Sequence, residues 1–87
     1  MNKRTEILET AADLVNNDRA RDYGTPQENM GRIASGWAVI LEQDVSAEQV
    51  ALCMAWLKIA RLIHGPHEDS YVDAAAYMAL AGELSEC

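Results

Sequence analysis

Apolar residues recur at helical spacing in four stretches of the chain, separated by short polar segments. The first stretch runs from about Thr5 to Asn17, and its apolar positions lie three and four residues apart, which is the period of an α-helix. The second begins after Thr25-Pro26-Gln27-Glu28, where a hydroxyl cap, a proline at the first helical position and an acid at the third favour a helix start. Both stretches therefore predict amphipathic helices.

Two further helices follow, and their ends are also marked. The third begins after the capping sequence Ser46-Ala47-Glu48-Gln49 and ends at His64-Gly65-Pro66, where glycine and proline terminate a helix. The fourth begins near Ser70, places Asp73 at its third position and runs to about Leu84. Its many alanines predict close packing against the third helix. Four helices with short connections predict an all-α, four-helix bundle-like fold.

The third helix is apolar on nearly every side. Between Val50 and Ile63 its only charged residues are Lys58 and Arg61, and Cys53 falls among the apolar residues, as a core position would. A helix of this kind requires neighbours all round, more than three short helices supply. We therefore expect a homo-oligomer, a dimer or higher, that completes the bundle, most simply through a two-fold axis.

Length, charge and cysteine content narrow the class of protein. The 87 residues predict one small domain, residues 1–87, and 14 acidic against 7 basic residues give a net charge of −7. This charge argues against nucleic-acid binding, which uses a basic surface. Two cysteines make no disulfide framework, the N-terminus is unlike a signal peptide, and no apolar stretch reaches the roughly 18–20 residues that cross a bilayer. We expect a cytoplasmic protein without a membrane or nucleic-acid partner.

Polar residues around the turn between the third and fourth helices form the main candidate site. Lys58 and Arg61 share one helix face, and Asp69, Asp73 and Tyr77 follow at four-residue spacing on the next helix. The short turn makes the two helices antiparallel neighbours, so the cations face the acids. One interpretation is a buried ion-pair network that clamps the hairpin, because removing one partner of a buried pair costs about 3–5 kcal/mol. The other interpretation is a ligand pocket, and the residues leave both open.

In the ligand interpretation each residue type has a role. Lys58 and Arg61 hold phosphate oxygens, the arginine through its bidentate fork and the lysine as a point charge. Asp69 and Asp73 orient the ligand or hold Mg²⁺, which prefers carboxylate oxygens and water. Tyr77 lies one turn further along the same face and is a further ligand-binding candidate, whereas in the ion-pair interpretation it donates a hydrogen bond within the network.

The polar loop DRARDYGTPQEN at residues 18–29 is a second candidate. Loops carry function more often than the elements that they connect, and Arg19, Tyr23 and Asn29 would close over a ligand. The alternative is a structural connection in which Gly24 allows a left-handed turn and Thr25 caps the next helix.

These segments carry a resemblance to a known family. The chain reads D-R-x-x-x-Y-G-x-P-x-E-N at residues 18–29, L-K-x-A-R at 57–61 and H-x-D-S-x-x-D-x-A-x-Y at 67–77. These motifs resemble a family of small uncharacterised proteins found mostly in bacteriophages and prophages, over residues Arg4 to Glu83. The resemblance implies a phage-encoded protein that acts in the cytoplasm of the host cell.

The K-x-x-R and D-x-x-x-D-x-x-x-Y arrangement is also similar to the phage domain called nucleotide modification associated domain 1. It is more distantly similar to the all-α MazG-like nucleoside triphosphate pyrophosphohydrolases, which hold magnesium with an E-x-x-E pair and a later E-x-x-D pair. Here Glu6 and Glu9 give the only early E-x-x-E spacing, and no E-x-x-D pair follows at the right place. The similarity therefore implies nucleotide binding more than metal-dependent hydrolysis.

Three functional hypotheses follow. The leading one is binding of a nucleotide or nucleotide-like phosphate ligand, with phosphoanhydride hydrolysis as the reaction if the protein is an enzyme. The second is an anti-defence sponge that sequesters a host nucleotide immune signal without turnover. The third is a structural or host-protein-binding module in which the ion pairs only clamp the hairpin.

Overall fold

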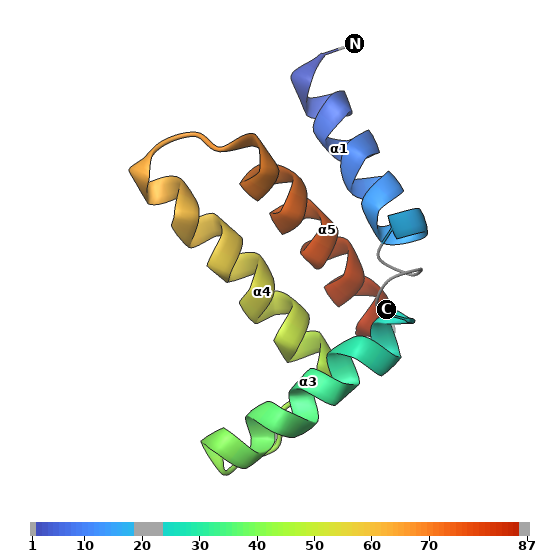
Figure 1. Cartoon of the computed structure of the whole chain (residues 1–87), viewed down its shortest axis with the longest axis vertical. Helices are drawn as coiled ribbons and strands as arrows, with labels where there is room; N and C mark the ends of the chain where they lie inside the picture. Colours follow the sequence, from blue (N-terminus) through green and yellow to red (C-terminus); the bar gives the residue numbers. More distant parts are fainter. Residues whose placement is uncertain (1, 19–23, 86–87) are drawn as a thin grey trace.

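The computed structural model describes residues 2–18 and 24–85, and every regular element in these ranges is helical (Figure 1). The elements are α1 Lys3–Asp13, the π-helical turn η1 Leu14–Asp18, α3 Pro26–Leu41, α4 Ala47–Arg61, the 3₁₀ turn η2 Leu62–His64 and α5 Glu68–Leu84. The predicted all-α fold is confirmed.

Side-chain caps fix the starts of the first three α-helices. Asn2 caps α1 by accepting a hydrogen bond from the Thr5 amide at 2.9 Å, so this helix begins earlier than its apolar pattern predicts. Thr25 caps α3 by accepting from the Glu28 amide at 3.1 Å. Ser46 caps α4 in a reciprocal capping box with the third helical residue. Both capping sequences recognised in the chain therefore start a helix where predicted.

The turn between α4 and α5 contains one correction. Gly65 follows η2 with a φ of 130°, which favours glycine, so the predicted stop is confirmed. However, α5 begins at Glu68 and not near Ser70. The reason is local: the Ser70 amide donates to the His67 carbonyl at 3.0 Å, and the Ser70 hydroxyl lies 2.9 Å from His67 Nδ1. These contacts extend the helix backwards, and the predicted third position of Asp73 is wrong.

The α4–α5 hairpin is the centre of the molecule. The two helices run antiparallel and pack along their length, as the alanine content of α5 predicts, while α1 packs against α5 and α3 crosses α4 (Figure 1). One core cluster joins α3, α4 and α5, and a second joins α1 to α5. The first contains Met30, Ala34, Val50, Ala51 and Ala81. The second contains Ala11, Val72 and Ala76. Small side chains dominate both clusters, so the helices approach closely around thin cores.

A large apolar area stays outside these cores. The accessible surface is 6009 Å², against roughly 5,100 Å² for a typical compact monomer of 9.6 kDa. On α4, Trp56 is 69% exposed, and Cys53 is exposed as well. The prediction that Cys53 is a core residue is therefore wrong, because α5 covers a different face of α4. No helix in residues 2–18 and 24–85 is long and apolar enough to cross a membrane.

Candidate functional site

Lys58 and Asp73 form an ion pair between α4 and α5. The distance from Lys58 Nζ to Asp73 Oδ2 is 3.4 Å, and the two side chains are 14% and 28% exposed. Lys58 lies on the side of α4 that faces α5, in line with the buried residues Ala51 and Ala55. Its stem covers apolar surface while its ammonium reaches the carboxylate. The structure thus brings these two candidate residues together as a clamp on the hairpin.

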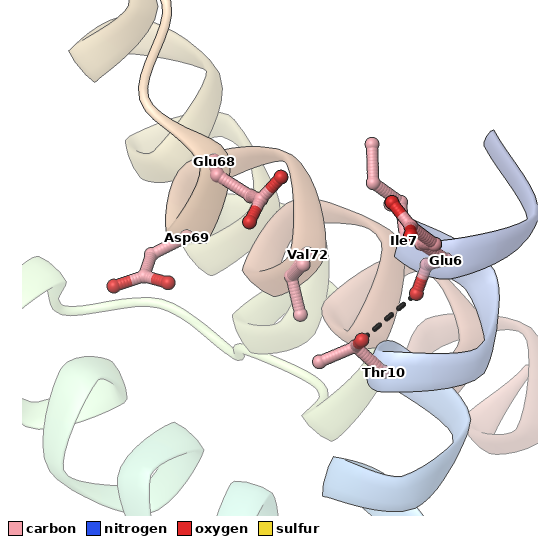
Figure 2. A pocket seen from close by; sticks show the side chains of 6 residues that line it. All are labelled: Glu6, Ile7, Thr10, Glu68, Asp69 and Val72. Carbon is pink, nitrogen blue, oxygen red and sulfur yellow. Dashed lines mark hydrogen bonds between the residues drawn. The ribbon is translucent and has the colours of Figure 1, made fainter. Parts of the chain in front are cut away.

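Arg61 and Asp69 lie apart from this pair. Arg61 ends α4 with an exposed side chain, and no carboxylate within the described ranges forms an ion pair with it. Asp69 is exposed in the first turn of α5. Figure 2 shows its carboxylate directed away from the side chains of α1. The four charged candidates therefore make one close pair and two solvated groups.

Asp69 borders an open pocket of about 330 Å³ between α1 and α5. The residues that line it are Glu6, Ile7, Thr10, Glu68, Asp69 and Val72 (Figure 2). Three of these carry carboxylates, so the pocket repels anions such as phosphate. The Thr10 hydroxyl is engaged by the Glu6 carbonyl, to which it donates at 2.8 Å.

One cation offsets the acids at this junction. Lys3 of α1 forms an ion pair with Glu68 of α5, and its Nζ also lies 4.0 Å from the Glu6 carboxylate. The hydrogen bond from Lys3 and its charge lower the pKa of Glu68 below its ordinary value, and Glu68 in turn raises the pKa of Lys3. The pair fastens the start of α1 to the start of α5. No sequence motif predicts this pair, because Lys3 and Glu68 are 65 residues apart in the chain.

The proposed magnesium ligands are Asp69 and Asp73. The Asp73 carboxylate already accepts the Lys58 ammonium, and a carboxylate neutralised in this way is a poor metal ligand. Within the part of the chain that the structure describes, no three His, Cys, Asp or Glu side chains are grouped so as to hold a metal ion. The donor set therefore does not fit Mg²⁺ well.

The remaining candidates are dispersed. Tyr77 is half-buried on α5 and packs against the core cluster around Met30. Asn29 precedes Met30 in the first turns of α3, where α3 meets Val50 near the start of α4. Arg61 is 11 residues further along the hairpin, or about 16 Å of helix. Arg19 and Tyr23 lie outside the described residues.

The fold and the clamped hairpin define a small all-α protein. Residues 6–85 match the family described as "Domain of unknown function (DUF6378)". The chain belongs to this family. The predicted membership of a phage family is confirmed by its relatives. The similarity to nucleotide modification associated domain 1 and to the MazG-like enzymes is not supported by these findings.

Two relatives are proteins of mycobacterial phages. The Gene 55 protein of Mycobacterium phage L5 is 44% identical over 80 residues, which cover 90% of this chain and 51% of the relative. The Gene 55 protein of Mycobacterium phage D29 is 38% identical over 81 residues, which cover 92% of this chain and 54% of the relative. The chain thus spans about half the length of these relatives. No solved structure matches it.

Proposed function

We propose that this chain is a helical protein-interaction module, built on a hairpin that the Lys58–Asp73 pair holds together. The observation that carries the proposal is a set of exposed, large apolar side chains on α3, α4 and η2. We call it the α3–α4 apolar surface, and it consists of Ile40, Leu41, Leu52, Trp56, Ile59 and Ile63. Exposed apolar area of this extent on a small protein is typical of a binding surface.

The surface is hollowed where α3 meets α4. An open pocket of about 300 Å³ there is lined by side chains of both helices and of the segment between them. Those side chains belong to Trp37, Leu41, Gln43, Val45, Gln49, Leu52 and Cys53. A second open pocket of about 260 Å³ adjoins it at Trp37, Ile40 and Leu41. Large anchor residues beside shallow apolar hollows are the usual anatomy of a protein interface.

The ion pair supports the same proposal. A phosphate that bound Lys58 would have to displace Asp73, which already neutralises it at 3.4 Å. Breaking a largely buried pair leaves an uncompensated charge and costs free energy. The pair therefore suits a structural role, in which it keeps α4 and α5 in register behind the apolar surface. This is the third of the hypotheses that the sequence left open.

A matched pair of photo-crosslinking residues tests the proposal. The probe residue replaces Trp56 on the α3–α4 apolar surface in one variant and Met78 on α5, also exposed, in the other. Both are expressed in bacterial cells and irradiated, and the adducts are identified by mass spectrometry. We expect a discrete protein adduct from position 56 and none from position 78. No adduct from position 56, or the same adducts from both, contradicts the interaction module.

A second candidate is the binding of a nucleotide-like phosphate ligand, and one observation favours it. Arg61 is exposed and, among the described residues, pairs with no carboxylate, so its guanidinium is open to a phosphate. In this arrangement Lys58 assists Arg61 from one turn away.

Thermal shifts test this second candidate. Nucleotides with and without Mg²⁺ are screened at millimolar concentration, because a ligand that binds only the folded chain raises its melting temperature. Arg61→Gln is expected to abolish the shift, and Arg32→Gln, which removes an exposed arginine from α3, to preserve it. Detection of hydrolysis products would show that the protein is an enzyme. Release of intact nucleotide on denaturation would show that it sequesters the nucleotide without turnover. No shift with any nucleotide excludes both.

A further inference from the structure

We propose that a second copy of this chain covers the α3–α4 apolar surface, and that the two copies meet through antiparallel α4 helices around a two-fold axis. The inference rests on the proposed interaction module and names its partner. Three features carry it: the spacing of the apolar side chains, the absence of acids among them, and the large accessible surface of the whole chain.

The spacing is self-complementary. Leu52, Trp56, Ile59 and Ile63 are separated by four, three and four residues, so they form one stripe along α4 that continues into η2. This is the interval of a helix–helix seam. Because the interval reads the same in both directions, an antiparallel copy places Trp56 against Ile59 of the partner subunit, and Leu52 against Ile63 of the partner subunit. Every contact is then repeated by the axis, as a two-fold interface requires.

The charge distribution allows two identical copies to approach here. Each chain carries a net charge of −7, so most faces of one copy repel the same face of another. From Gln49 to His64 there is no acidic residue, and the only cations are Arg61 and the clamped Lys58. Two copies of a face without acidic residues do not repel each other. A partner recognised through charge would instead require charged residues along the edge of this stripe.

The accessible surface of the chain is also consistent with a second copy as the partner. The accessible surface of 6009 Å² exceeds that of a typical compact monomer of this mass by roughly 900 Å². A standard stable interface buries about 800 Å² on each partner. The excess over the whole chain is thus about the area that a dimer interface covers on one copy. Trp56 stands at the centre of the stripe, and large aromatic side chains dominate interface energetics.

Light scattering after size exclusion tests the dimer on the full chain, over about 1 μM to about 1 mM. We expect twice the 9.6 kDa of one chain at the upper end. Trp56→Glu and, separately, Ile63→Glu are expected to give the single-chain mass with unchanged circular dichroism, since both side chains are mostly exposed, at 69% and 83%. Met78→Glu introduces the same charge on α5 and is expected to stay dimeric.

Four outcomes overturn the inference. They are a single-chain mass for the wild type throughout, an assembly larger than two, a Trp56→Glu variant that still dimerises, and dissociation by Met78→Glu as well. A single-chain mass together with an adduct to another protein from position 56 rejects only the second copy and leaves the interaction module standing. A single-chain mass with no adduct rejects both.

Cysteine pairs test the antiparallel direction. In a Cys53→Ser, Cys87→Ser background, Leu52→Cys together with Ile63→Cys is expected to form disulfide-linked dimers on mild oxidation. Within one chain these positions lie 11 residues apart, or about 16 Å of helix, too far for a bridge. Leu52→Cys alone is the control, because the axis places its two copies at opposite ends of the seam. Equal crosslinking by the control overturns the antiparallel arrangement.

Discussion

At the residue scale, Lys58 shows how a cation is accommodated in an apolar helix. The face of α4 that meets α5 is built from the small residues Ala51 and Ala55, which bring the helices close. One turn further, the aliphatic stem of Lys58 continues this face, and its ammonium reaches Asp73. The pair is short of full burial, so both ions keep part of their hydration and the cost of desolvation is reduced.

Removing one partner of this clamp should destabilise the protein more than removing both. Asp73→Ala leaves the Lys58 ammonium largely buried without a counter-ion, and we expect a loss of about 1–2 kcal/mol. Lys58→Met combined with Asp73→Leu replaces the pair by apolar groups and should stay within about 1 kcal/mol of wild type. Urea unfolding at one protein concentration measures both. Asp44→Ala, which removes an exposed acid, is the control for net charge. A double variant as unstable as the single one contradicts the clamp.

The Lys3–Glu68 pair makes a prediction about pH. Lys3 lowers the folded-state pKa of Glu68 below its ordinary 4.5. The stabilisation of the α1–α5 junction is therefore present above that ordinary value, and it is lost as the pH falls through the lower pKa of the folded state. An NMR titration of the Glu68 carboxyl should show this low pKa, and Lys3→Ala should return it towards 4.5.

Arg4→Ala is the matched control for that titration. It removes a neighbouring exposed cation of α1 and should leave the Glu68 pKa where it is. Added salt should move the Glu68 pKa of the wild type in the same direction as Lys3→Ala does, because both charged groups are exposed and salt screens their interaction. A Glu68 pKa that does not respond to Lys3→Ala contradicts the pair.

At the element scale, the sequence predicts those features whose causes lie within a few residues. The caps at Thr25 and Ser46 and the stop at Gly65 are local, and the structure has all three. The sequence predicts a start of α5 near Ser70, whereas the contact between His67 and Ser70 extends the helix back to Glu68. The Lys58–Asp73 pair is also nearly local, since a short turn dictates which residues face each other.

Contacts between segments that are far apart in the sequence could not be predicted from it. The contact of Lys3 with Glu68 depends on α1 packing against α5, which no spacing in the chain encodes. The separation of Asn29 from Arg61 depends on α3 crossing near the start of α4. The dispersal of the predicted ligand residues is therefore a consequence of helix packing that only the folded structure reveals.

The end of α3 carries a testable strain. Glu42 follows the helix in the left-handed conformation, with a φ of 55°, where a side chain costs about 1 kcal/mol or more and glycine does not. Glu42→Gly should therefore stabilise the protein by about 0.5–1 kcal/mol, measured as a higher urea midpoint with an unchanged slope. Gln43→Gly is the control and should give no gain, since its φ is not positive. A loss of stability in Glu42→Gly contradicts the interpretation.

At the scale of the whole molecule, the extended shape and the large exposed surface have the same cause. The radius of gyration is 13.6 Å, against about 12 Å for a compact chain of this length. The helices extend from a central hairpin around two thin cores, so part of the stability that a larger core would supply is missing. A second copy on the α3–α4 apolar surface would bury the stripe around Trp56 and supply it.

The melting temperature should then depend on protein concentration. For a dimer that unfolds to two chains, each tenfold increase in concentration adds about 1.4 kcal/mol to the stability of the assembly by mass action. The melting temperatures of wild type and Met78→Glu, followed by circular dichroism, should rise with protein concentration over a hundredfold range. Trp56→Glu should melt at one lower temperature throughout, because its stability comes from a single chain. A wild-type midpoint that does not change with concentration contradicts the dimer and would mean that the two small cores suffice without a second copy.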